Sequence, residues 1–150
     1  MVRDTPLSEI TLRKYEKPYE SPKRELVRKV CLSLGLLQPG DSRDIIIDIL
    51  LVLDDARRQK TMLSSFEIGN KVESLRKQNS LEIKGLAESN IRRQLKRLRD
   101  AMIAEKFENK YRLAEFLSLS EIFTTKIEKF LVPQIIERIK DYLAKLDSAQ

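Results

Sequence analysis

Residues 86–113 have the sequence LAESNIRRQLKRLRDAMIAEKFENKYRL, and this stretch decides the fold. Its first half predicts a helix over about 88–101, because apolar residues recur there at helical spacing and form one narrow stripe. The stripe consists of Ile91, Leu95, Leu98 and Met102. The opposite face has Ser89, Arg93, Lys96 and Arg97 at its centre, Asn90 beside them, and Arg92 and Arg99 on the flanks. We expect the stripe to face a core and the basic face to lie in solvent.

The second half of the stretch predicts a β-hairpin. Short extended segments at 103–107 and 110–114 flank Glu108-Asn109, and asparagine tolerates the positive φ of a tight turn. We expect Tyr111, which begins the second segment, to pack in the core, although its ring could also stack on a sugar or base.

Two helices are expected immediately upstream. Ser64 followed by Glu67 is a capping-box pattern, which predicts a helix from there to about Gln78. Before it, Asp41-Ser42 can cap a helix whose residues Ile45 to Leu53 are apolar except for Asp48, so that it is buried on nearly every side. Its β-branched content also suits a central strand, but the polar residues 54–59 continue more naturally as helix. We expect the acidic pair Asp54-Asp55 to lie on the helix surface.

The N-terminal part begins with an extended arm over 1–22, which mixes charges, tyrosines and prolines without a sustained period. Ser21-Pro22 then predicts a helix start, because proline at the first helical position loses no needed donor. Gln38-Pro39-Gly40 is expected to end this helix. Cys31 lies among apolar neighbours in it, which favours an inert packed thiol over a redox sensor.

The C-terminal region, 118–150, opens on a second capping-box pattern, Ser118 with Glu121, and predicts helix to about Leu146. Its apolar residues change face near Pro133, which we expect to kink or break the helix. Beyond the change, one stripe is expected to form a homodimer interface, with intrachain core as the other interpretation. The stripe consists of Val132, Ile135, Ile139, Tyr142 and Leu146.

Composition limits the function. The formal net charge is +6, and residues 86–112 hold eight lysines and arginines against four acids, which favours a polyanionic partner. One cysteine and no histidine exclude a disulfide framework, a structural zinc site within one chain and histidine-dependent catalysis. We expect no enzyme activity, no metal, no cofactor and no membrane segment, and a cytoplasmic location, since neither a signal peptide nor a long apolar run is present.

The segments MLSSFEIGNKV, 62–72, and LAESNIRRQLKRLRDAMIAEKFENKYRL, 86–113, resemble the second helix, recognition helix and wing of MarR-, ArsR- and PadR-like transcriptional regulators. The resemblance covers about half the chain. It implies a mainly α fold with a winged helix-turn-helix over about 42–114, within a domain over 23–117, followed by the C-terminal dimerisation region. Met102 departs from this pattern, since a glycine commonly ends that helix.

The implied function is sequence-specific binding of double-stranded DNA by a transcriptional regulator, with helix 88–101 in the major groove. Ser89, Asn90, Arg93 and Arg97 are the candidates for base contacts, because arginine donates twice to guanine and asparagine pairs twice with adenine. Arg92, Lys96, Lys110 and Arg112 are the candidates for phosphate contacts. The alternatives are an ordinary solvated basic helix, and a winged-helix protein-interaction module in a replication or transcription assembly.

Overall fold

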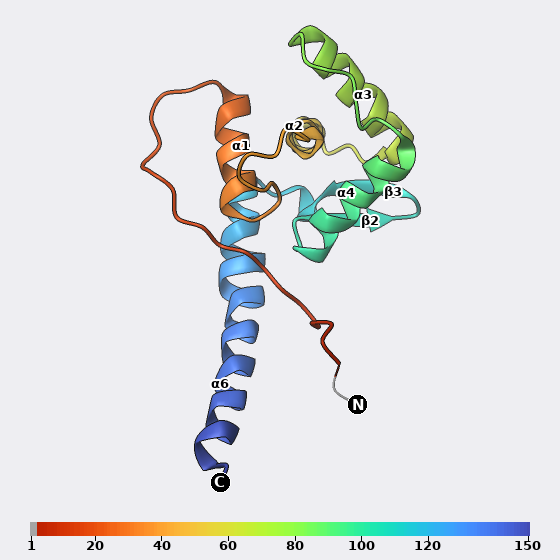
Figure 1. The fold of residues 1–150 in the computed structure, drawn as a ribbon. Helices are drawn as coiled ribbons and strands as arrows, with labels where there is room; N and C mark the ends of the chain where they lie inside the picture. Colours follow the sequence, from red (N-terminus) through yellow and green to blue (C-terminus); the bar gives the residue numbers. More distant parts are fainter. Residues whose placement is uncertain (1–2) are drawn as a thin grey trace.

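The computed structural model describes residues 3–150 and is mainly helical, with one small antiparallel sheet and a long C-terminal helix (Figure 1). The mainly α class expected from the sequence is confirmed. Helix α2 (Ile45–Arg58) lies at the centre and is seen end-on in Figure 1. Around it lie α1 (Lys23–Ser33), α3 (Ser65–Gln78) and α4 (Glu88–Asp100). Every residue of α2 from Ile45 to Leu53 is buried except Leu51, as its apolar run predicted.

Charged side chains from three helices meet at the surface of α2 and form what we call the ion cluster, Arg24, Asp44, Asp48 and Arg76. Asp48 of α2 is fully buried and accepts hydrogen bonds from Arg24 of α1 and, at 2.6 Å, from Arg76 of α3. Asp44 also accepts from Arg76, at 3.0 Å. The cluster therefore connects α1, α2 and α3 by charge-assisted bonds, with Asp48 and Arg76 buried and Arg24 and Asp44 partly exposed.

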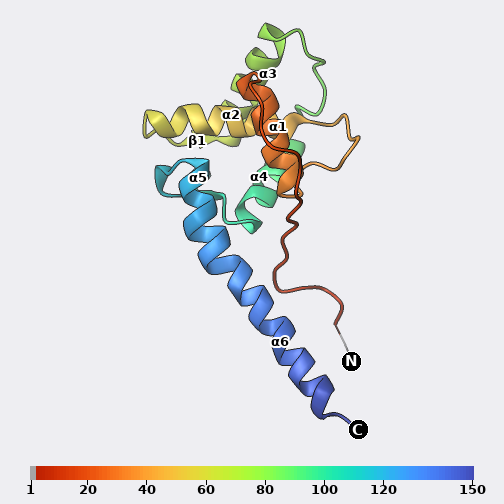
Figure 2. The ribbon, with the colours of Figure 1, turned by 90° about the vertical axis from the view of Figure 1, so that its left-hand side faces the viewer.

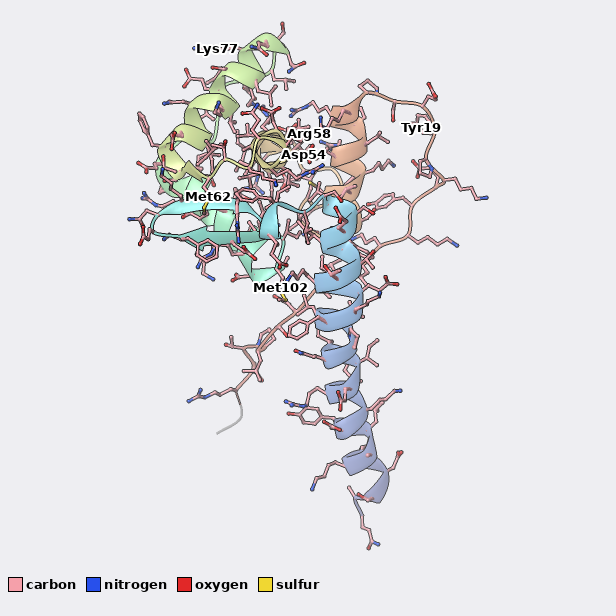
Figure 3. The ribbon with its side chains drawn as sticks, turned by 180° about the vertical axis from the view of Figure 1, so that it is seen from behind. Tyr19, Asp54, Arg58, Met62, Lys77 and Met102 are labelled. Carbon is pink, nitrogen blue, oxygen red and sulfur yellow. The ribbon has the colours of Figure 1, made fainter. Side chains whose placement is uncertain are left out.

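Of the acidic pair expected on the surface of α2, Asp55 is exposed but Asp54 is buried, so the expectation was wrong for Asp54. Only 8% of Asp54 is exposed, and it accepts hydrogen bonds from Lys23 of α1 and Arg57, both at 2.8 Å. Arg58 lies beside the same carboxylate (Figure 3). Burial raises the pKa of Asp54, but the bonds from Lys23 and Arg57 outweigh burial and hold the pKa below its usual value. The pattern of apolar residues could not reveal these partners, which come partly from another helix.

The sheet has three strands in the order β1-β3-β2, all antiparallel. Strands β2 (Ala104–Phe107) and β3 (Lys110–Leu113) form the expected hairpin, and both turn residues, Glu108 and Asn109, have positive φ (+48° and +67°). Two positive φ values in a two-residue loop match the twist of the flanking strands. Strand β1 (Leu63–Ser64), which we did not predict, pairs with β3 immediately before α3 begins.

Both capping boxes are confirmed, at Ser64 with Glu67 and at Ser118 with Glu121. Two other helix ends differ from expectation. Helix α2 begins at Ile45, and Asp41 instead accepts hydrogen bonds from the backbone and side chain of Arg43. Helix α1 ends at Ser33, well before Pro39, because the chain turns at Gly35 with φ +71°. A side chain there would also collide with the side chain of Thr11.

The C-terminal region is one continuous helix, so the expected kink or break at Pro133 was wrong (Figure 2). It comprises α5 (Leu119–Ile122), a π-helical segment (Phe123–Leu131) and α6 (Val132–Ser148). Pro133 lies in the first turn of α6, where the π pattern changes to the α pattern. The change of hydrogen-bond spacing accommodates the missing proline N–H without ending the helix. Among residues 3–150 there is no helix of the length and apolarity needed to cross a membrane.

The arm runs from residue 3 to Pro22 without regular structure. It bows away from the start of α1 and returns past the end of this helix (Figures 1 and 2). Ile10 and Tyr15 of the arm pack against the core. The Arg13 backbone N–H donates to the Ser33 carbonyl at 2.8 Å, and its side chain donates to the Leu32 carbonyl at 2.7 Å. The arm is thus fixed to the turn that follows α1.

Candidate nucleic-acid interface

Helix α4 is held rigidly by its apolar side. Ile91, Leu95 and Leu98 are fully buried, as the predicted stripe requires, whereas Met102, its fourth member, lies beyond the end of α4 and is half-buried. Helix α4 packs against α3, α2 and β2. At its start, the Ser65 hydroxyl of α3 donates to the Glu88 carboxylate at 2.9 Å. At its end, Met102 adopts φ +64° and the Ile103 N–H donates to the Leu98 carbonyl at 2.8 Å. This is the exit usually made by glycine, so Met102 carries local strain.

The opposite side of α4 presents cations to solvent. The exposed polar side chains of this face are Ser89, Arg92, Arg93, Lys96 and Arg99. Arg92 pairs with Glu88 at 3.1 Å and Lys96 with Asp100 at 3.0 Å, both one helical turn away. Exposed pairs of this kind contribute little free energy, so a phosphate can replace the carboxylate at small cost.

Arg93 and Asn90 lie together near the start of α4. Arg93 is exposed, and its guanidinium donates to the Asn90 side-chain oxygen. Asn90 is half-buried, and its amide donates to the Gly85 carbonyl at 2.8 Å. A base contact by Asn90 requires that these bonds be released, whereas Arg93 can swing into solvent by giving up one.

Arg97 differs from the other predicted base-contact residues because it is half-buried and turned toward the domain. Its guanidinium donates to the Leu36 carbonyl at 2.8 Å and to the Gln94 side chain at 2.7 Å. The helical pattern predicted an outward position, but a long side chain on the flank reaches the turn after α1. Arg97 therefore anchors α4 to that turn.

The hairpin lies beside α4 (Figure 1) and carries one exposed cation of the predicted set, Lys110. Arg112, the other, is half-buried: it pairs with Glu105 at 2.9 Å and lies between the Phe107 and Phe116 rings, 4.9 and 4.8 Å from their centroids. These cation–π contacts and the ion pair occupy its guanidinium. Tyr111 is only 3% exposed, which confirms the core position expected for it.

Two exposed cations were left out of the predicted contact set. Arg99 lies on the last turn of α4, and Lys106 lies on β2 with its ammonium 5.7 Å from the Tyr111 ring. Both residues belong to the basic segment 86–112, and its concentration of charge was the feature of the sequence that could have identified them. Arg99 was recognised as flanking the basic face, and Lys106 follows directly after the helix in a strand whose alternation is too short to assign faces.

The stripe predicted as a dimer interface is the most exposed apolar surface of the helix that carries it. Val132 and Ile135 are half-buried, whereas Ile139, Tyr142 and Leu146 are 54%, 72% and 67% exposed. Ile136 and Leu143 widen the stripe and are about half exposed. Helix α6 contains no buried residue and projects away from the domain (Figure 2).

Comparison of the chain with protein-family models, with curated proteins and with solved structures found no match.

Proposed function

We propose that this protein is a sequence-specific double-stranded DNA-binding transcriptional regulator. Helix α4 enters the major groove and the β2–β3 hairpin contacts the adjacent backbone. The observation that carries the proposal is the solvent face of α4 with its exposed cations Arg92, Arg93, Lys96 and Arg99. The other face of the same helix is fixed in the core by three fully buried side chains, those of Ile91, Leu95 and Leu98. Cations on a rigid element are suited to a polyanion of regular shape.

The order of elements supports a winged helix-turn-helix. Helix α2, strand β1, helices α3 and α4, and strands β2 and β3 follow one another, and β3 lies between β1 and β2 in the sheet. This arrangement brings the hairpin next to the helix that presents the cations, as the winged helix-turn-helix requires. The connection between α3 and α4, residues 79–87, is longer than the usual turn of three or four residues.

The bonds that the predicted side chains already make within the domain reduce the set of proposed DNA contacts. Arg93 and Ser89 are the foremost candidates for base edges, with Asn90 available after its bond to Gly85 is released. Arg92, Lys96 and Lys110 are the proposed phosphate contacts. Arg97 and Arg112 are assigned to positioning α4 and the hairpin, because their guanidinium groups are already bound within the domain.

A pair of alanine variants tests the division between base and phosphate contacts. Arg93→Ala is expected to relax sequence preference at one or two positions and to weaken specific binding by about 1 to 3 kcal/mol. Lys110→Ala is expected to weaken all sequences nearly equally. Arg138→Ala is the matched control, because Arg138 is also exposed but lies on α6 in a pair with Asp141. Identical effects of Arg93→Ala and Lys110→Ala across a panel of duplexes would show that the assignment of α4 is wrong.

We further propose that α6 forms a symmetric homodimer through its apolar stripe. About two heptads form a short coiled coil, so other surfaces are expected to contribute. A twofold arrangement allows two copies of α4 to enter successive major grooves about 34 Å apart. Ile139→Asp is expected to give monomers in light scattering with the domain still folded, whereas Lys140→Asp, outside the stripe, is expected to leave the dimer intact. A monomeric wild-type protein at high concentration would contradict this part.

One observation favours a second function. Phe66, on the first turn of α3, is 66% exposed, and Phe107 of the hairpin is 51% exposed. Exposed aromatic side chains are typical of protein interfaces. A winged-helix protein-interaction module therefore remains the alternative, and failure to bind any duplex pool at low salt would favour it.

A further inference from the structure

We propose that the outer face of the β2–β3 hairpin binds an unpaired nucleobase, which stacks on the ring of Phe107. The base belongs to a single-stranded segment of DNA that continues from a duplex. The duplex part of this proposal rests on the proposed DNA-binding function, whereas the stacking site does not.

The strand register defines the outer face of the hairpin. Phe107 pairs with Lys110 and Glu105 pairs with Arg112. Side chains of paired residues, and side chains two positions apart on a strand, lie on one face of a sheet, so these four share a face. The opposite face is the buried one and carries Ala104, Tyr111 and Leu113.

Phe107 is the outer member of a stack of aromatic rings and a cation. The Arg112 guanidinium carbon lies 4.8 Å from the centroid of the Phe116 ring and 4.9 Å from the centroid of the Phe107 ring. Phe116 is half-buried, whereas Phe107 is 51% exposed. Because Arg112 covers one face of the Phe107 ring, we infer that the exposed surface of Phe107 includes the other face. A further flat group can continue the stack there.

The stack is ordered before any ligand arrives. Glu105 pairs with Arg112 at 2.9 Å, and the two charges neutralise each other on the outer face. A ring that is already held by its neighbours loses little conformational freedom when a base packs on it. Every nucleobase has a flat π surface, so we expect little base preference at this site.

The remaining charges favour a nucleotide over a protein side chain. Lys110 lies opposite Phe107 and is exposed, and Lys106 directly precedes Phe107 and is also exposed. These two lysines outweigh Glu108 in the turn. A nucleotide that stacks on Phe107 brings its phosphates near the lysines, and aromatic side chains beside cations are typical of surfaces that bind single strands. The cores of protein interfaces are depleted in lysine.

The hairpin and α4 are placed to bind one DNA molecule. Strand β2 packs against α4, beside which the hairpin lies in Figure 1. A strand that leaves a duplex held on α4 therefore reaches the hairpin within a few nucleotides. Two linked contacts bind more tightly than either alone, so a duplex with a single-stranded extension is expected to bind more tightly than a blunt duplex.

The chain contains no tryptophan, which allows a direct test of stacking in the full-length protein. Phe107→Trp puts a single tryptophan at the end of the stack, where a stacked base quenches its fluorescence. We expect saturable quenching by oligothymidylate, a single strand that forms no duplex, and by a duplex with a thymidine extension. Phe130→Trp is the matched control, because Phe130 is 48% exposed but lies on the C-terminal helix, and it is expected not to be quenched.

Fluorescence anisotropy of labelled DNA then separates stacking from simple apolar contact. Phe107→Leu keeps an apolar side chain but removes the flat ring, and it is expected to weaken binding of oligothymidylate about tenfold. Phe130→Leu is expected to leave binding unchanged. The wild-type protein is expected to bind the extended duplex about tenfold more tightly than the blunt duplex, and Phe107→Leu is expected to abolish this preference. If Phe107→Leu does not fold, quenching in Phe107→Trp decides.

Three results would overturn the proposal: no quenching in Phe107→Trp, equal quenching in Phe130→Trp, or unchanged affinity for oligothymidylate in a folded Phe107→Leu protein. Each of them would favour a protein partner for the exposed Phe107. Quenching by oligothymidylate without any binding of the blunt duplex would leave the stacking site established and refute the proposed function alone. Binding of the blunt duplex without quenching would refute the stacking site alone.

Discussion

Removal of the Asp48 carboxylate is expected to destabilise the domain strongly. Asp48 is fully buried and joins Arg24 of α1 to Arg76 of α3. The side chain of Arg76 is only 7% exposed and that of Arg24 19%, so neither guanidinium can regain full hydration when Asp48 is lost. Asp44 and the Glu82 carbonyl remain as partners of Arg76, at 3.0 and 2.7 Å.

Breaking a buried ion pair from one side costs about 3 to 5 kcal/mol, and the remaining partners of Arg76 favour the lower end, about 3 kcal/mol. A whole domain is stable by only about 5 to 15 kcal/mol, so Asp48→Ala removes a large share. At 150 residues the melting temperature is expected to fall by roughly 10 °C. Urea denaturation followed by circular dichroism measures the change in free energy of unfolding.

Asp141→Ala is the matched control, because Asp141 also pairs with an arginine, Arg138 at 3.3 Å, but both side chains are about two-thirds exposed. It is expected to change the free energy of unfolding by less than about 0.5 kcal/mol. A fall of less than about 1 kcal/mol in the free energy of unfolding of Asp48→Ala would refute the inference that the ion cluster joins the three helices. A buried charge that loses its partner destabilises the folded state by more than this.

The remaining predictions concern a thiol, a turn and a carboxylate. Burial raises the pKa of the Cys31 thiol to about 12, so the folded protein is expected not to react with iodoacetamide at neutral pH, and rapid alkylation would show that the thiol is accessible. Replacing Glu108-Asn109 by Asn-Gly is expected to raise the free energy of unfolding by about 1 kcal/mol, since both positions have positive φ; a lower melting temperature would contradict the turn geometry. Burial raises the pKa of Asp54, but the hydrogen bonds from its cationic partners lower this pKa by more than burial raises it, so the folded pKa lies below the unfolded one. The free energy that ionised Asp54 contributes to stability is therefore fully present above its unfolded pKa of about 4, and it is lost as the pH falls through the lower folded pKa. Asp54→Asn is accordingly expected to lower stability at neutral pH more than at about pH 3, and equal losses in urea titrations at the two pH values would refute this linkage.

The sequence predicted correctly those structural features that depend on residues close together in the chain. The capping boxes at Ser64 and Ser118 place two helix starts correctly because each is closed by a residue three positions away. The stripe of α4 and the turn at Glu108-Asn109 were also predicted, since they depend on spacing and backbone conformation within a few residues.

Features that depend on distant partners were not predicted. Strand β1 has two residues, too few for any alternation, and exists because it pairs with β3. Helical periodicity predicted the side of α4 from which the Arg97 side chain leaves the backbone. It could not predict that the guanidinium reaches the Leu36 carbonyl, which lies on a distant segment. Arg112 likewise belonged to a basic run, while its aromatic neighbours and Glu105 hold it in place.

Pro133 shows a different limit. Its expected effect follows from the α-helical hydrogen-bond pattern, but the residues before it adopt the π pattern. The helix therefore continues, and the apolar stripe of α6 extends the same rod that begins beside the domain (Figure 2).

The most direct test of the central claim is the affinity of the wild-type protein for a random duplex DNA pool, measured by fluorescence anisotropy over a range of salt concentrations. If four or five of the exposed cations on α4 and the hairpin displace counterions, the logarithm of affinity falls against the logarithm of salt with a slope of about −4 per chain. Binding at low salt with such a slope is the predicted result. No binding to the pool at low salt, or an affinity that does not change with salt, would contradict the proposal that this face of the protein binds DNA.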